Sequence, residues 1–126
     1  MSESVTNYRP ARAVFDDITF PRVIEAASDD GVEFLVAEQD SCVVGYLLAV
    51  RLPTLFAGVT ILEVLELSVA EPMRGRGPGS ALIRAVQARP REAKNVELTV
   101  PTCRAVDFYR ALGFHETAVR LKRSTT

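Results

Sequence analysis

The residues of this sequence best suited to bind a charged ligand lie in one glycine-rich run, Arg74-Gly75-Arg76-Gly77-Pro78-Gly79-Ser80. A strand-like stretch at 61–69 precedes the run, and a helix-like stretch at 77–88 follows it. A helix that starts after glycines leaves several backbone N–H groups without partners, beside the positive end of its dipole. Glycines also let a ligand approach the backbone closely. The run therefore predicts a site for phosphate oxygens.

The glycine spacing argues against two common nucleotide-binding loops. A P-loop ends in Gly-Lys-Ser/Thr, and the run contains no lysine. A dinucleotide loop follows Gly-x-Gly-x-x-Gly, a spacing that Gly75, Gly77 and Gly79 do not match. An arginine–glycine contact with RNA is a further alternative. It is disfavoured because one short run lacks the repeats and interleaved aromatic residues of RNA-binding tracts.

Composition indicates an ordinary globular protein. The 126 residues fit a single domain, 1–126, with 48% hydrophobic and 25% charged residues. A formal net charge of −1 argues against a general nucleic-acid binder. No apolar stretch approaches the ~20 residues that cross a membrane, and the first residues lack the features of a signal peptide. We therefore expect a cytoplasmic protein that binds neither nucleic acid nor membrane.

The sequence predicts no metal site. Its two cysteines, Cys42 and Cys103, lie far apart, and His115 is its one histidine. A nucleophilic pair of Cys103 and His115 is disfavoured, because Cys103 fits the opening of a helix and buried thiols are usually inert.

The elements that must position these residues follow a mixed order of strands and helices. Gly113 is expected to end the last helix as a C-terminal cap. The segments 32–38 and 42–51 are β-rich and read as an antiparallel hairpin. The full expectation is strands at 32–38, 42–51, 61–69, 95–100 and 115–122, a short first strand near 8–14, and helices at 15–27, 77–88 and 103–112.

The strand–helix–strand order from 61 to 100 predicts a right-handed crossover between two parallel strands. A ligand of such a unit binds outside the carboxyl ends of the strands. The glycine run lies at that edge.

Two motifs make the second half of the chain similar to the GNAT N-acetyltransferase superfamily, as a small bacterial-type member. The first is Arg-x-x-Gly-x-Gly at 74–79, after a strand. The second is Ala-x-x-Phe-Tyr-x-x-x-Gly-Phe at 105–114. The resemblance covers 61–122, with weaker support from 43–48.

The resemblance implies an α/β (α+β) fold. Its mixed central sheet would have antiparallel N-terminal strands, a splayed parallel pair at 65–69 and 96–100, and helices on both faces. It further implies that acetyl-CoA is held between the splayed strands and that the acyl group passes directly from the thioester to an amine.

The resemblance also implies which residues hold the cofactor. Pro78 departs from the pattern, because the family usually has an aliphatic residue with a free N–H there, while Arg76, Gly77, Gly79 and Ser80 keep theirs. Thr102 replaces a frequent asparagine and fits a helix N-cap. The expected cofactor residues are Leu67, Ser68, Val69, Arg74, Gly75, Arg76, Gly77, Pro78, Gly79, Ser80 and Thr102.

The N-terminal region is short for a member of this family. It has room for one good helix where the family often has two. The acceptor pocket is therefore either open or completed by a second subunit of a homodimer.

Acylation of an amine needs a base for the amine and an acid for the leaving thiolate. The resemblance implies Glu63 as the base, with Glu66 as its competitor. In a regular strand these two glutamates face opposite sides, and a β-bulge would change that parity. The resemblance implies Tyr109 as the acid, although its helical spacing with Phe108 alone favours a core tyrosine.

We therefore expect an acetyl-CoA-dependent N-acetyltransferase that acts on a small-molecule or peptide primary amine in a ternary complex. The rival hypothesis is a non-catalytic acyl-CoA-binding module on the same fold.

Overall fold

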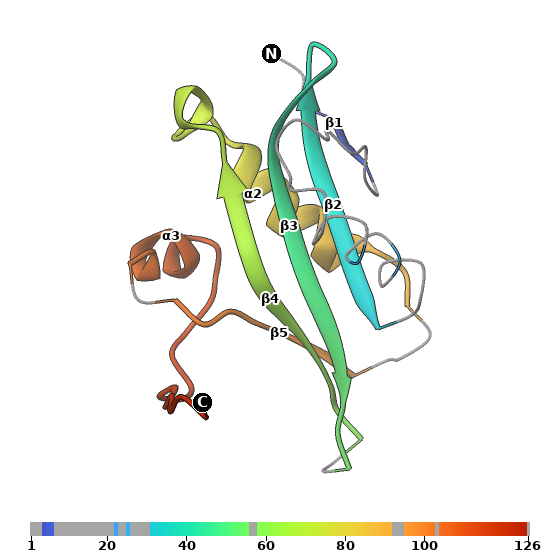
Figure 1. The fold of residues 1–126 in the computed structure, drawn as a ribbon, viewed down its shortest axis with the longest axis vertical. Coiled ribbons are helices and arrows are strands. Elements are labelled where there is room, and N and C mark those ends of the chain that lie inside the picture. The colour runs from blue at the N-terminus through green and yellow to red at the C-terminus, as the bar shows by residue number, and fades with distance from the viewer. Residues whose placement is uncertain are drawn as a thin grey trace.

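A computed structural model of the chain describes residues 4–6, 22, 25, 31–55, 58–91, 95–102 and 104–125. Five strands form one mixed sheet in the order β1-β2-β3-β4-β5 (Figure 1). They are β1 (Ser4–Thr6), β2 (Val32–Gln39), β3 (Cys42–Pro53), β4 (Thr60–Val69) and β5 (Val96–Thr99). Neighbouring strands are antiparallel except β4 and β5, which are parallel. The predicted fold class and the predicted parallel pair are confirmed.

The hairpin of β2 and β3 turns through Asp40 and Ser41, whose φ angles of 52° and 65° are left-handed. A two-residue loop of this handedness matches the twist of the flanking strands. The expected hairpin is therefore confirmed, and its register places Gly45 beside β4. A Cβ on Gly45 would lie 2.8 Å from the carbonyl oxygen of Ser68, so this close approach of β3 to β4 requires glycine.

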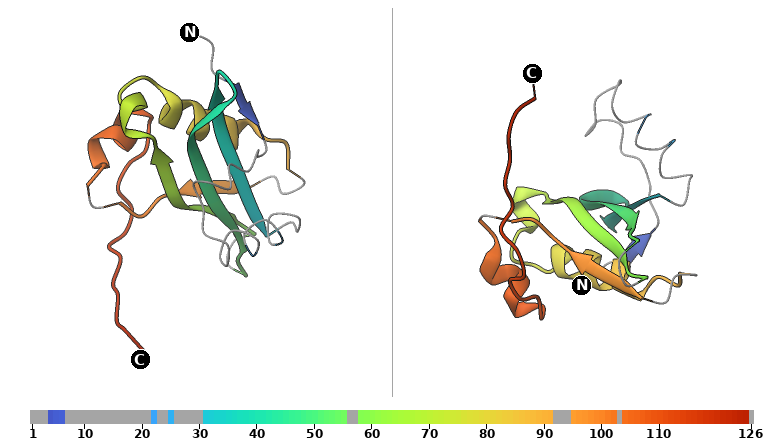
Figure 2. Two further views of the ribbon diagram at one scale, coloured as in Figure 1. Left: turned by 45° about the horizontal axis from the view of Figure 1, so that its top comes forward. Right: turned by 90° about the horizontal axis from the view of Figure 1, so that it is seen from below.

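The helix α2 (Pro78–Ala88) connects β4 to β5 and covers one face of the sheet (Figures 1 and 2). Its buried residues include Leu82, Ile83 and Val86, which are four or fewer residues apart and so form one apolar stripe. These side chains pack on the inward row of the sheet to form the main core, with Leu35, Ala37, Val44, Leu47, Ala49, Leu62 and Val64.

The helix α3 (Val106–Ala111) is shorter than the predicted 103–112. It ends as expected at Gly113, whose φ is 94°. The N–H of Phe114 donates to the carbonyl of Tyr109 at 3.1 Å, and that of Gly113 donates to Arg110 at 3.0 Å. This pattern is a Schellman motif, and the rings of Tyr109 and Phe114 supply its apolar contact with centroids 5.5 Å apart.

The predicted strand at 115–122 is wrong. Residues 114–125 form neither strand nor helix, and the end of the segment extends away from the sheet (Figure 2). Val119 and Leu121 are 85% and 89% exposed. The alternation of apolar and charged residues suggested a strand, but an alternating segment becomes a strand only when a neighbouring strand accepts its hydrogen bonds.

The first strand lies at Ser4–Thr6 and pairs with β2, whereas the strand expected near 8–14 lies outside the described residues. Of the helix predicted at 15–27, Arg22 and Glu25 are described, and both are helical and exposed. None of the described helices is both long and apolar enough to cross a membrane.

Candidate functional site

A pocket opens where the two parallel strands separate. β4 and β5 pair only from Thr60 with Val96 to Glu63 with Thr99. Beyond this point the strands diverge, and a cavity of about 360 Å³ lies between them. Its lining residues are Tyr46, Val64, Leu65, Glu66, Leu67, Ser68, Val100, Pro101, Thr102, Ala105 and Tyr109. The splay was expected between 65–69 and 96–100, but on the β5 side it begins only after Thr99.

A register shift in β4 determines which side chains reach the pocket. Val64 pairs with Ala49 and Glu66 with Leu48, so Leu65 is an extra residue in β4. Such a bulge reverses the alternation of side chains beyond it. Leu67 consequently packs on the same core as Val64. Glu63 and Glu66 both lie on the face away from α2, whereas a regular strand would have separated them.

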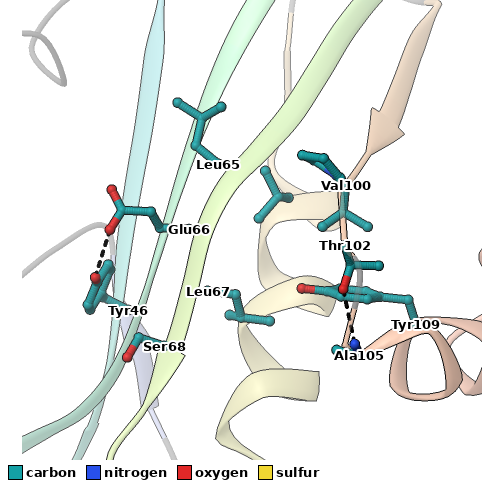
Figure 3. A pocket seen from close by; sticks show the side chains of 11 residues that line it. Tyr46, Leu65, Glu66, Leu67, Ser68, Val100, Thr102, Ala105 and Tyr109 are labelled. Carbon is teal, nitrogen blue, oxygen red and sulfur yellow. Dashed lines mark hydrogen bonds between the residues drawn. The ribbon is translucent and has the colours of Figure 1, made fainter. Parts of the chain in front are cut away.

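Glu66 lines the pocket beside Tyr46 of β3 (Figure 3). The Tyr46 hydroxyl donates a hydrogen bond of 2.9 Å to Oε1 of Glu66. Burial, the hydrogen bond to Glu66 and the charge of that carboxylate raise the pKa of Tyr46 to about 12. The Tyr46 ring packs edge-on against Phe34, with centroids 5.9 Å apart. Sequence analysis did not identify Tyr46, because its partner lies 20 residues away and across a bulge.

Glu63 is not among the residues that line the pocket. It sits on the paired part of β4, next to Thr99 of β5. The Thr99 hydroxyl donates to Oε1 of Glu63 at 3.5 Å, and Nη1 of Arg120 lies 3.4 Å from Oε2. The Glu63 carboxylate thus has two partners outside the pocket.

Tyr109 lies on the other side of the pocket, and its hydroxyl points across the gap toward Leu67 (Figure 3). The side chain is 7% exposed and belongs to the main core. Its ring packs edge-on against Phe108 and Phe114. Burial raises the pKa of the Tyr109 phenol above its ordinary value. The ring is therefore held rigidly while its hydroxyl reaches the pocket.

Thr102 lies beside Tyr109 in the pocket wall and accepts a hydrogen bond of 3.1 Å from the N–H of Ala105 (Figure 3). The donor lies three residues after Thr102, as for an N-cap hydroxyl, but the N-cap of α3 is Ala105 and not Thr102 as predicted. The helix starts at Val106, later than the sequence suggested.

The glycine run forms the turn between β4 and α2, after the short 3₁₀ helix η2 (Glu71–Met73). Gly75 and Gly77 have φ angles of 78° and 106°, which disfavour any other residue. Pro78 is the first residue of α2 and is buried. The Arg76 N–H donates to the carbonyl of Met73 at 3.1 Å, which corrects the expectation that it stays free.

Three N–H groups at the start of α2 keep their capacity to donate. In the part of the chain that the structure describes, those of Gly77, Gly79 and Ser80 have no backbone acceptor. The side chain of Arg74 folds back, and its Nε donates to the carbonyl of Val69 at 3.2 Å. Arg76 is exposed. The turn can thus offer three N–H donors and two cationic side chains to an anion.

Gly79 brings the start of α2 against α3. A Cβ at this position would lie 3.2 Å from Cζ of Phe108 and 3.6 Å from Cγ2 of Val69. Tyr109 follows Phe108 in α3. The close approach of Gly79 to Phe108 therefore places the N–H donors of the turn next to the pocket wall that contains Tyr109.

The backbone of β4 also faces the gap between the strands. The Ala70 N–H donates to Val44 on the β3 side at 2.8 Å. Backbone groups alternate sides along a strand, so those of Val69 and Leu67 point toward the gap. Of the predicted cofactor residues, Leu67, Ser68 and Thr102 line the pocket, whereas Val69 and 74–80 continue from it along the chain. The described residues contain no group of three His, Cys, Asp or Glu able to hold a metal ion.

Comparison with solved structures gives the same fold. A transcriptional regulator from Bacillus halodurans C-125 superposes with a TM-score of 0.80 at 19% identity, covering 98% of this chain and 99% of the other. An aminoglycoside acetyltransferase from an uncultured soil metagenomic sample gives 0.75 at 20% identity, covering 89% and 78%. Glucosamine-6-phosphate N-acetyltransferase from Arabidopsis thaliana gives 0.77 at 11% identity, with full coverage of both chains.

A comparison with curated proteins found no match. The family model for the acetyltransferase (GNAT) family matches residues 3–114. That range spans most of the chain and contains the glycine run, the splayed strands and Tyr109. This protein therefore belongs to the acetyltransferase (GNAT) family of N-acetyltransferases.

Proposed function

We propose that this protein transfers the acetyl group of acetyl-CoA to a primary amine, by direct attack of the amine on the thioester in a ternary complex. The observation that carries the proposal is the pocket between the diverging ends of β4 and β5. It has a carboxylate, Glu66, on one side and a phenol, Tyr109, on the other. Two substrates that enter from these two sides would meet at 65–68.

The glycine run suits the pyrophosphate of the cofactor. The N–H groups of Gly77, Gly79 and Ser80 would donate to phosphate oxygens at the positive end of α2, and Arg76 would add charge. Each hydrogen bond to a charged acceptor contributes about 1.5–3 kcal/mol. The backbone of Leu67 and Val69 would hold the cofactor arm in the gap and donate to the thioester oxygen as charge develops there.

We assign the base to Glu66 rather than Glu63. An alkyl amine with an ordinary pKa of ~10.4 is mostly protonated at neutral pH. Glu66 would accept that proton, directly or through one water, and the neutral amine would then attack the carbonyl carbon. Glu63 lies outside the pocket and already holds Thr99 and Arg120.

Tyr109 would act at the leaving group. As the bond between carbon and sulfur breaks, its hydroxyl donates a proton to the thiolate of coenzyme A. Its raised pKa keeps the phenol protonated at neutral pH, so the donor is always present.

The experiment that tests the function is an amine screen. Thiol release from acetyl-CoA is measured across aminoglycosides, amino sugars, polyamines, amino acids and peptides. We expect turnover with at least one amine and a higher melting temperature in coenzyme A, since a ligand of the folded state stabilises it. Stabilisation without turnover would favour the non-catalytic acyl-CoA-binding module. With neither effect, both functions would be wrong.

A pair of variants tests the choice of base. Glu66→Gln and Glu63→Gln make the same change on the same face of β4, three residues apart. We expect Glu66→Gln to lower kcat/KM by about 10²–10⁴-fold, the range for general base assistance. Glu63→Gln should lower it far less. The reverse order would return the base to Glu63.

A further inference from the structure

Tyr46 is a further polar residue of the pocket. Its hydroxyl contacts Glu66, on the side opposite the one proposed for the leaving thiolate. It belongs to β3, in the middle of the sheet, and lines the cavity opposite Tyr109. Its hydroxyl reaches across to β4 and donates to one carboxylate oxygen, Oε1 of Glu66, at 2.9 Å (Figure 3). The other oxygen, Oε2, is then the one that can meet an amine.

We propose that Tyr46 is a positioning residue, which holds the Glu66 carboxylate in one orientation for receiving the amine proton. The proposal rests on the proposed function. Glu66 is an exposed side chain on a bulged strand and has several free rotamers by itself. A hydrogen bond to one oxygen removes most of this freedom.

The surroundings of Tyr46 hold its ring in place and keep its hydroxyl protonated. Its ring is half-buried and packs against the buried Phe34. The phenol has a pKa of about 12 and stays protonated throughout the pH range in which an acetyltransferase is assayed. The Tyr46 hydroxyl therefore stays available as a donor to Glu66 over that pH range.

Removing the donor while keeping the ring tests the proposal. We expect Tyr46→Phe to lower kcat by about tenfold and to leave the KM for acetyl-CoA unchanged, because the Glu66 carboxylate loses its fixed orientation while the turn before α2 is untouched. In the Glu66→Gln background, Tyr46→Phe should have no further effect on kcat, since the two residues act as one unit.

Phe34→Leu is the matched control. It disturbs the packing of the Tyr46 ring without removing the hydrogen bond, so it should lower the melting temperature and leave kcat nearly unchanged. If Tyr46→Phe also changes only the melting temperature, Tyr46 is structural and the proposal is wrong. An additive loss in the double variant would overturn it as well.

A measurement that does not depend on catalytic activity separates this proposal from the proposed function. In protein labelled at tyrosine ¹³Cζ, the Tyr46 signal is assigned by its loss in Tyr46→Phe. Glu66→Gln should let that signal begin to titrate at lower pH, because both the acceptor and its charge are gone. No change, in an active enzyme, overturns the role of Tyr46 alone. A clear change in a protein that acetylates no amine overturns the proposed function, and the role of Tyr46 with it.

Discussion

At the scale of single residues, Tyr109 shows how one side chain can serve the core and the site together. Its ring is buried among Phe108, Phe114 and the core under α2, as the helical spacing predicted. Its hydroxyl nevertheless ends in the pocket. The role that the family resemblance implies, proton donation to the leaving thiolate, stays a prediction. The two interpretations of this residue are therefore compatible, and a substitution that keeps the ring separates them.

Tyr109→Phe removes the hydroxyl and preserves the packing. We expect kcat to fall by about 10²–10⁴-fold, because the leaving thiolate loses its proton donor. Cofactor affinity, measured by calorimetry, should change little, because in the proposed function the turn before α2 holds the pyrophosphate. An unchanged kcat would leave Tyr109 as a core residue only.

At the scale of elements, the turn before α2 limits which substitutions can probe cofactor binding. Gly77 has a φ of 106°, so any side chain there is strained, and a Cβ on Gly79 would press on Phe108 at 3.2 Å. A loss of binding in variants of either glycine would therefore mix local distortion with lost contacts. Pro78 has an ordinary helical position and is the better probe.

Pro78→Val adds a fourth N–H at the start of α2 with a side chain of similar size. We predict equal or tighter binding of coenzyme A, by at most the ~1.5–3 kcal/mol of one charge-assisted hydrogen bond. Calorimetry measures the difference, and the melting temperature without ligand checks that the fold is intact. Clearly weaker binding by a folded variant would mean that the proline itself shapes the turn.

At the scale of the whole molecule, a buried ion pair connects the sheet to the segment that follows α2. Glu33 of β2 is 3% exposed. Arg91 holds it with two hydrogen bonds, from Nε at 2.8 Å and Nη2 at 2.6 Å. The same guanidinium also donates to the carbonyls of Val86 and Arg89. Nε of Arg51 lies 3.3 Å from Glu33 but is not aligned to donate.

Glu33→Gln should lower the free energy of unfolding by about 3–5 kcal/mol, because the buried guanidinium of Arg91 would lose its counter-charge. Glu97→Gln makes the same change at an exposed position of β5 and should stay within about 0.5 kcal/mol. Chemical denaturation measures both. Equal effects would show that the cluster around Glu33 contributes little.

The C-terminal segment gives a second test at this scale. Val119→Ser with Leu121→Ser should change the free energy of unfolding by no more than about 0.5 kcal/mol, because both side chains are already exposed. Leu62→Ala in the core should cost about 2–5 kcal/mol and calibrates the measurement. A comparable loss in the double variant would restore the strand expected at 115–122.

Local sequence signals determined much of this protein. Apolar periodicity located β2 to β5 and α2, since each pattern reports how one element buries its own face. Gly113 ended α3 and the glycine run opened α2, because a left-handed backbone is a property of single residues. The family motifs led to Tyr109, Thr102 and the turn at 74–80.

The tertiary structure decided what depends on pairing between distant segments. The extra residue at Leu65 exists only in the register of β4 against β3, and it turns Glu66 toward Tyr46 and the pocket. Whether the Arg76 N–H is free depends on the fold of the turn, and whether 115–122 is a strand depends on a neighbour to pair with. Hydrogen-bond register is a property of two chain segments together, so no pattern within one segment can specify it.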